Sequence, residues 1–300
     1  MTIVLWLRSW LVACWVVMAS LALGQAGTRQ DALALEQQGR NAEAAEIWRS
    51  IAQHDPRNAE AVAHLGLIEA RQEHYGQAIS HYRKALELDP AFPQLQMNLG
   101  LALFKTDQFG DAAKAFGAEL EKHPGDARLI TLLGMTHYAM GDYLVAIPYL
   151  QKATEGGSPK DDSQMAALRL TLARSCLWSR QYACVIQSAG EIPATNPGSA
   201  EAAMLAGEVL DAEGKTAAAI ERFKATIEAN PRQPDAHFGL GYLYWRQGQF
   251  AEAAAAFKAE LELNPSNDEA RGYLAPVANR KEPARSLIEV MPNAQPPAQP

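Results

Sequence analysis

Prolines recur in this sequence at a spacing of 34 residues, and this period constrains the fold more than any other feature. The prolines form two evenly spaced sets, which are Pro56, Pro90 and Pro124 and then Pro197, Pro231 and Pro265. The gap between the two sets is 73 residues, which is two periods plus five residues. A period of this length is typical of architectures in which each repeat packs only on its neighbours.

Other residue types recur in the same frame. Alanine stands 12 residues before five of the prolines, a large aromatic residue 8 before, and glycine 24 before four of them. These residues are Ala44, Ala78, Ala112, Ala219 and Ala253; Trp48, Tyr82, Phe116, Phe223 and Phe257; and Gly66, Gly100, Gly207 and Gly241. Small residues let two helices approach closely, and proline ends a helix because its ring clashes with the preceding turn. The pattern therefore predicts two packed helices in each repeat.

This frame resembles the tetratricopeptide repeat (TPR), a helix–turn–helix unit with small residues at positions 8 and 20, an aromatic residue at 24 and proline at 32. Leu99-Gly100, Ala112, Phe116 and Pro124 show the resemblance best. It extends over seven units, which are 25–58, 59–92, 93–126, 127–160, 166–199, 200–233 and 234–267. The resemblance implies an all-α fold, a right-handed α–α superhelix (solenoid) of seven helix–turn–helix repeats followed by a C-terminal capping helix.

Residues 1–26 have the character of a signal peptide. An apolar run of 15 residues follows Arg8. Its length suits a signal peptide and is short for a membrane-spanning helix, which needs about 20 residues. We expect cleavage near Ala26 and a periplasmic or secreted mature protein. The alternative is an uncleaved anchor, residues 1–23, that holds the protein on the extracytoplasmic side of a membrane.

The remaining chain divides around one insertion. Residues 27–160 hold repeats 1–4 and residues 166–267 hold repeats 5–7. The insertion, 161–165, belongs to a turn-rich segment that we interpret either as a hinge between two subarrays or as a tolerated surface loop. Residues 268–281 repeat the start of a first helix and are expected to cap the array. The proline-rich tail, 282–300, is expected to be disordered.

Composition and motifs exclude several functions. The chain has 34 acidic and 27 basic residues and a net charge of −7, whereas nucleic-acid binding favours a basic excess. It has no phosphate-binding loop, nucleophile elbow or zinc-binding histidine pair, and its seven histidines are scattered. We therefore predict no catalytic residues, no metal site and no cofactor, and we do not expect an enzyme.

The resemblance also implies a binding groove, because positions 2, 5, 9 and 12 of the first helix line the concave surface in this family. Large side chains occupy many of these positions, namely Met97, Leu101, Phe104, Met135, Tyr138, Leu170, Arg174, Leu177, Met204, Phe238, Tyr242 and Trp245. The last three form the most contiguous stripe, whereas the sixth repeat is acidic and would favour partners with basic residues. The alternative is that these side chains pack against neighbouring helices in a tight superhelix.

Cys176 and Cys184 lie at positions 11 and 19 of the fifth repeat. They would be the only cysteines of an exported, cleaved protein, whose compartment is oxidising. We predict either a disulfide that joins the two helices or two small buried apolar side chains.

These observations favour a non-catalytic scaffold that binds a protein or peptide segment in its concave groove, outside the cytoplasm. The identity of that partner and the oligomeric state do not follow from the sequence, and a membrane is involved only through an uncleaved N-terminal segment. One alternative is a membrane-tethered subunit for envelope assembly or oligomerisation that acts through its convex faces. Another is an accessory factor of an enzyme.

Overall fold

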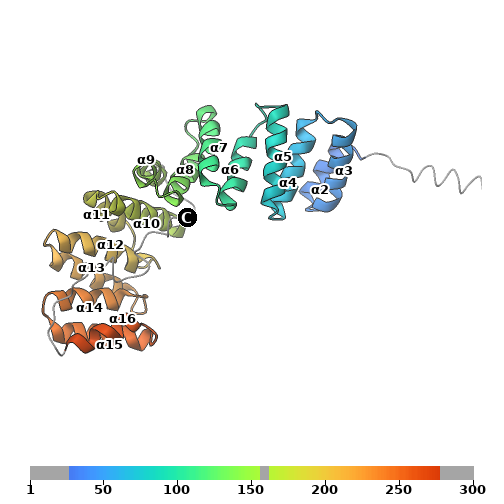
Figure 1. The fold of residues 1–300 in the computed structure, drawn as a ribbon. Coiled ribbons are helices and arrows are strands. Elements are labelled where there is room, and N and C mark those ends of the chain that lie inside the picture. The colour runs from blue at the N-terminus through green and yellow to red at the C-terminus, as the bar shows by residue number, and fades with distance from the viewer. Residues whose placement is uncertain (1–26, 156–161, 278–300) are drawn as a thin grey trace, which may run out of the picture. The chain divides into compact units, whose positions relative to one another are not determined.

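The computed structural model describes residues 27–155 and 162–277, and every regular element within these ranges is an α-helix (Figure 1). The helices are α2 (Arg29–Gln37), α3 (Asn41–His54), α4 (Ala59–Arg71), α5 (Tyr75–Leu88), α6 (Leu95–Lys105), α7 (Phe109–Lys122), α8 (Ala127–Ala139), α9 (Tyr143–Glu155), α10 (Asp162–Trp178), α11 (Tyr182–Gly190), α12 (Ser199–Ala212), α13 (Thr216–Ala229), α14 (Ala236–Arg246), α15 (Phe250–Leu263) and α16 (Asp268–Val277). The predicted signal peptide and proline-rich tail lie outside the described residues, as do the last four residues of the predicted capping segment.

The helices form seven consecutive pairs, from α2–α3 to α14–α15, and α16 follows the last pair. This arrangement confirms the all-α repeat fold. The chain has two compact units, residues 1–115 and 116–300, with the boundary inside α7. We call them the N-terminal unit and the C-terminal unit. Within each of them, successive helices pack side by side, and the first helix of one repeat also touches the first helix of the next.

Small residues bring the two helices of a repeat together as the sequence predicts. A Cβ atom added to Gly66 of α4 would lie 2.7 Å from Cε1 of Tyr82 on α5. A Cβ on Gly241 of α14 would lie 2.9 Å from Cδ1 of Phe257 on α15. Both rings are buried, so larger side chains at these glycines would force the helices apart.

The turn between the two helices has the same backbone conformation in all seven repeats. The residue at position 15 has a positive φ in every one, and these residues are Gly39, Glu73, Asp107, Gly141, Arg180, Gly214 and Gly248. In the first repeat, the N–H of Gly39 donates to Glu36 O at 3.0 Å and that of Arg40 to Leu35 O at 2.9 Å. This pair of bonds is a Schellman motif, which ends a helix with a left-handed residue. The repeat therefore specifies its turn through the backbone, and glycine occupies four of the seven positions.

The structure differs from the sequence prediction at the insertion. Helix α10 begins at Asp162, so four of the five inserted residues extend the helix instead of forming a loop. Met165 is buried there, at 9% exposure, which gives the extension an apolar contact. Helices α9 and α10 also pack directly against each other. The boundary between the compact units falls within α7 and not at the insertion. Residues 156–161 lie outside the described residues, so the choice between a hinge and a surface loop there stays a prediction.

Candidate partner-binding surface

The predicted groove residues divide into two groups. Six are partly exposed, namely Met97, Leu101 and Phe104 on α6, Met135 and Tyr138 on α8, and Arg174 on α10. Six are buried, namely Leu170, Leu177, Met204, Phe238, Tyr242 and Trp245. The buried six belong to the cores between helices, which was the alternative interpretation of the pattern.

The stripe formed by Phe238, Tyr242 and Trp245 is not an open groove. Helix α16 places Tyr273 against all three rings, with centroid distances of 5.9, 5.5 and 4.7 Å. Trp245, the most exposed of the three, is only 5% exposed. Helical spacing places the three residues on one face, and the element that covers this face is the capping helix of the same chain.

The acidic side chains of the sixth repeat do not form a free acidic surface either. Glu201 on α12 pairs with Arg174 on α10, and Asp211 pairs with Arg246 on α14. Burial lowers the pKa of the Arg174 guanidinium, but the Glu201 carboxylate and the Tyr138 hydroxyl together raise it above its ordinary value. These carboxylates join neighbouring repeats, so they do not select a basic partner.

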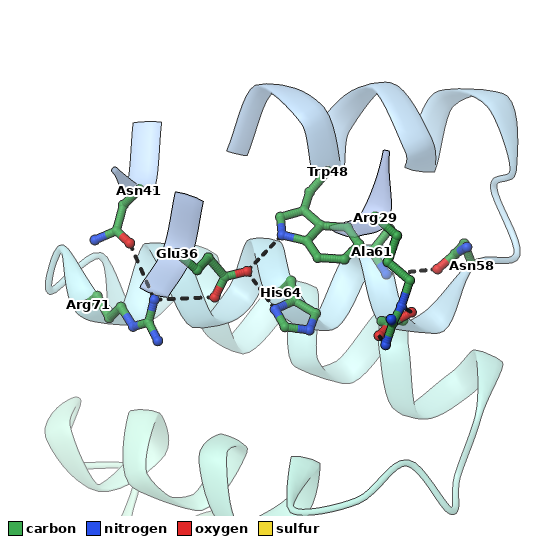
Figure 2. Close-up of polar contacts among 9 residues, drawn as sticks. Arg29, Glu36, Asn41, Trp48, Asn58, Ala61, His64 and Arg71 are labelled. Carbon is green, nitrogen blue, oxygen red and sulfur yellow. Dashed lines mark hydrogen bonds and ion pairs between the residues drawn. The ribbon is translucent and has the colours of Figure 1, made fainter. Parts of the chain in front are cut away.

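A similar pairing joins the first two repeats. The carboxylate of Glu36 on α2 is only 6% exposed and accepts three hydrogen bonds (Figure 2). Trp48 Nε1–H and His64 Nδ1–H donate to Glu36 Oε1, each at 2.7 Å. Arg71 Nη1–H donates to Oε2 at 3.2 Å and also reaches Asn41. The rings of Trp48 and His64 are stacked, with centroids 4.4 Å apart, which fixes the first helix pair on α4.

In the N-terminal unit, the partly exposed residues Met97, Leu101 and Phe104 share one face of α6 at helical spacing. Phe104 contacts the ring of Phe109 edge-on, with centroids 5.3 Å apart. This face is apolar and partly open to solvent, so it remains a candidate contact for a partner.

In the C-terminal unit, aromatic side chains gather where the first helix of a repeat turns into the second. The centroid of Tyr143 lies 5.7 Å from that of Tyr138 and 6.5 Å from that of Trp178. At the starts of α9 and α11, directly after Tyr143 and four residues after Trp178 in the sequence, are three exposed apolar side chains, namely Leu144 at 68%, Val145 at 45% and Tyr182 at 42% exposure. We call these six residues the aromatic edge.

Most of the aromatic edge was not predicted from the sequence, because the predicted groove positions all lie on the first helix of a repeat. Only Tyr138 was among the predicted residues. Position 17, the first residue of the second helix, holds Tyr143 and Tyr182 but also Tyr75, Phe109 and Phe250, so it does not single out this edge. Bulky apolar residues at a position that faces solvent are informative when they are contiguous.

Cys176 on α10 and Cys184 on α11 form a disulfide, with Cα atoms 5.8 Å apart. That separation lies within the range that a disulfide needs. The bond encloses the turn of the fifth repeat and joins its two helices.

Within the residues described, no group of three or more histidine, cysteine, aspartate or glutamate side chains could hold a metal ion. None of the helices in the same ranges is long and apolar enough to cross a membrane.

Glu260 on α15 is a buried carboxyl group of the last repeat. Its side chain is buried, and burial together with the nearby Asp235 carboxylate raises its pKa. Hydrogen bonds from the Phe238 N–H and from Asn267, and the neighbouring His237, oppose the increase. The folded state therefore binds the Glu260 proton more tightly than the unfolded state does.

We expect the stability of this repeat to fall as the pH rises from about 4.3, the ordinary pKa of glutamate, through the raised pKa of Glu260. Glu260→Gln should flatten that part of the profile. Thermal denaturation of both proteins at a series of pH values measures the difference. Equal slopes would show that Glu260 does not titrate with folding.

The described residues thus define a helical repeat protein whose exposed apolar side chains lie at the edges of its repeats. A family model for the tetratricopeptide repeat matches residues 97–162 and 204–268, and a TPR repeat model matches residues 66–107. The matches together cover more than half of the chain, which therefore belongs to the tetratricopeptide repeat family.

Solved structures agree with this assignment. The C-terminal part of a TPR repeat-containing protein from Cytophaga hutchinsonii is 18% identical, with a TM-score of 0.65 over 82% of this chain and 98% of that chain. The structure of Naa15/Naa10 bound to HypK-THB is 17% identical, with a TM-score of 0.54 over 93% of this chain and 42% of that chain. Both show the likeness of fold alone. The search of curated proteins gives no match.

The family assignment supports a role in protein–protein interaction, and tetratricopeptide repeats are in general non-catalytic.

Proposed function

We propose that this protein is a non-catalytic scaffold that binds a segment of a partner protein at the aromatic edge of its C-terminal unit. The observation that carries the proposal is the exposure of apolar side chains there, above all Leu144 at 68%. A large apolar side chain in water is unfavourable by about 1.5–3 kcal/mol relative to burial, so contiguous ones favour contact with a partner.

The edge suits an extended or helical segment with apolar anchors. Tyr143 packs near both Tyr138 and Trp178, so these rings are ordered before a partner arrives. Rigid aromatic residues lose little conformational entropy on binding, which is why they are common among residues that dominate binding energy. Arg174 lies beside Tyr138 but is paired with Glu201, so the surface offers apolar contact more than charge.

The test compares two changes of the same kind at different places. Leu144→Ser combined with Tyr182→Ser removes two of the three exposed side chains of the edge, whereas Leu263→Ser removes an apolar side chain on α15 that is 38% exposed. A photo-reactive residue at Val145 identifies what binds. We expect the edge variant to lose the cross-linked partner and Leu263→Ser to retain it. Retention by both variants would refute the proposal, and a cross-link to a second copy of the chain would support the oligomerisation alternative.

We also propose that the protein works outside the cytoplasm, because residues 1–26 have the signal pattern and a disulfide forms in an oxidising compartment. N-terminal sequencing of protein from its natural host is expected to begin near residue 27. A chain that begins at Met1 and stays with washed membranes would support the anchor instead. A full-length chain in the cytoplasmic fraction would refute export.

A further inference from the structure

The fifth repeat lacks the large side chain that the other repeats place at position 24 of their second helix. Position 24 holds Ala189, whereas the other repeats have Trp48, Tyr82, Phe116, Leu150, Phe223 and Phe257 there. Its second helix, α11, has 9 residues, whereas the second helices of the other repeats have 13 or 14. A small side chain at this position removes buried contacts that hold the two helices of a repeat together. The disulfide between Cys176 and Cys184 therefore joins two helices that lack the contacts of a large side chain at position 24.

The two sulfur-bearing residues differ in access. Cys176 is fully buried, whereas Cys184 is partly exposed and lines a cavity of about 270 Å³ between α9, α10 and α11. Cys184 is also in the first turn of α11, where backbone N–H groups favour a negative charge on sulfur. A reagent from solvent can therefore approach Cys184 but not Cys176.

The cavity carries charges of both signs. Arg169 and Glu191 form an ion pair in its wall, with Arg169 Nε and Glu191 Oε2 3.0 Å apart, and Glu155 adds a second carboxylate to the lining. The amide of Gln187 adds hydrogen-bonding groups. A small molecule that bears both a carboxylate and an ammonium group complements this lining better than a neutral molecule or one with a single charge.

We propose that Cys184 is a thiol–disulfide exchange site, served by a low-molecular-mass thiol that carries both an ammonium and a carboxylate group, as cysteine does. The thiolate of the small molecule attacks Cys184 Sγ, the bond between the two cysteine sulfurs breaks, and the electron pair stays on Cys176 Sγ, which takes a proton from water. A second thiolate attacks the sulfur of the bound small molecule and releases the Cys184 thiolate and an oxidised dimer of the small thiol. Two small thiols are oxidised and one protein disulfide is reduced.

Exchange at this site loosens the fifth repeat. The bond joins α11 to α10, and α10 is itself joined to α12 by the pair of Arg174 with Glu201. When it opens, α11 depends on its short packing face alone. The redox state of the small-thiol pool therefore sets how firmly α11 is held. This proposal does not depend on partner binding at the aromatic edge.

The first experiment asks which sulfur reacts, in full-length protein that carries Cys14→Ser. Cys176→Ser leaves Cys184 as the single thiol, and Cys184→Ser leaves Cys176. Each protein is treated with cystine and followed by intact mass, with circular dichroism as the control for folding. We expect Cys184 to form the mixed disulfide at least about tenfold faster than Cys176. Equal rates, a faster Cys176, or two free thiols in the unreduced Cys14→Ser protein would overturn the proposal.

The second experiment asks whether the cavity selects the reagent. The measured quantity is the rate at which Cys184 reacts with cystine divided by the rate at which it reacts with the neutral hydroxyethyl disulfide. This ratio is compared between proteins with and without Glu155→Gln, which changes an exposed side chain. We expect the variant to lower this ratio about threefold, as for one solvent-exposed ion pair, while its rate with the neutral reagent stays the same. An unchanged ratio would overturn the assignment of the ligand.

The third experiment follows the consequence by amide hydrogen exchange before and after treatment with cysteine. We expect exchange to increase in α11 (Tyr182–Gly190) and to remain unchanged in α15 (Phe250–Leu263), which lacks cysteine. Equal protection of α11 in both states would overturn the inference that the bond holds this helix.

Discussion

Replacing Gly239 by alanine is expected to destabilise the C-terminal unit by about 2 kcal/mol, although alanine is the better helix former. A Cβ at this position would lie 2.4 Å from both Cε1 and Cζ of Phe223, much closer than carbon atoms approach. Phe223 is fully buried, so its ring has no free space to move into. Chemical denaturation followed by the signal of the tryptophans, together with hydrogen exchange at α13 and α14, measures the loss.

The control is the same substitution at a different helical glycine. Nothing lies within 4 Å of a Cβ at Gly272 on α16, so Gly272→Ala is expected to stabilise this helix by about 0.5–1 kcal/mol. The same substitution is thus expected to change the free energy of unfolding in opposite directions at two sites of the same unit. A further test replaces the ring by a smaller side chain. In the Phe223→Leu background, Gly239→Ala is expected to lower the free energy of unfolding by less than it does alone, and additive losses would show that the two residues do not clash.

The fold was predictable because its determinants are local and repeated. Gly66 and Gly241 occupy position 8 of their repeats, where the neighbouring aromatic ring leaves no room for a side chain. The same spacing of small and aromatic residues recurs along the chain. The close contact between Gly239 and Phe223 was not predictable, because it joins the seventh repeat to the sixth. His64 stacks on Trp48 from the equivalent position, so the same contact is made by quite different residues.

The candidate surface was harder to predict than the fold. Positions on one face of a helix follow from spacing, but their exposure depends on which other element covers them. Tyr242 occupies a groove position by spacing and is buried by Tyr273 of α16, a contact that no repeat pattern specifies. Leu144, in contrast, lies outside the groove positions and is largely exposed. The sequence therefore indicates which side chains are large, whereas packing decides which of them a partner can reach.

Replacing Glu36 by leucine is expected to destabilise the N-terminal unit by about 3 kcal/mol, since it leaves three donors without their acceptor. Trp48 contributes most of the loss because its ring is fully buried and Nε1–H has no other acceptor within reach in this cluster. Arg71 is 42% exposed, so water replaces much of what it loses. Chemical denaturation of the full chain, with near-ultraviolet circular dichroism to follow Trp48, measures the effect.

Two matched changes show whether the carboxylate itself is responsible. Glu46→Leu on α3 alters a carboxylate that is 79% exposed and is expected to leave the free energy of unfolding essentially unchanged. Combining Glu36→Leu with Trp48→Phe removes the buried N–H together with its acceptor, so the double variant should lose less than the two single changes added together. A loss from Glu36→Leu as small as that from Glu46→Leu would show that the cluster orders side chains without stabilising the repeat. Because Glu36 joins residues of the first two repeats, its removal should loosen α2 and α3 before α4, and hydrogen exchange can follow that order.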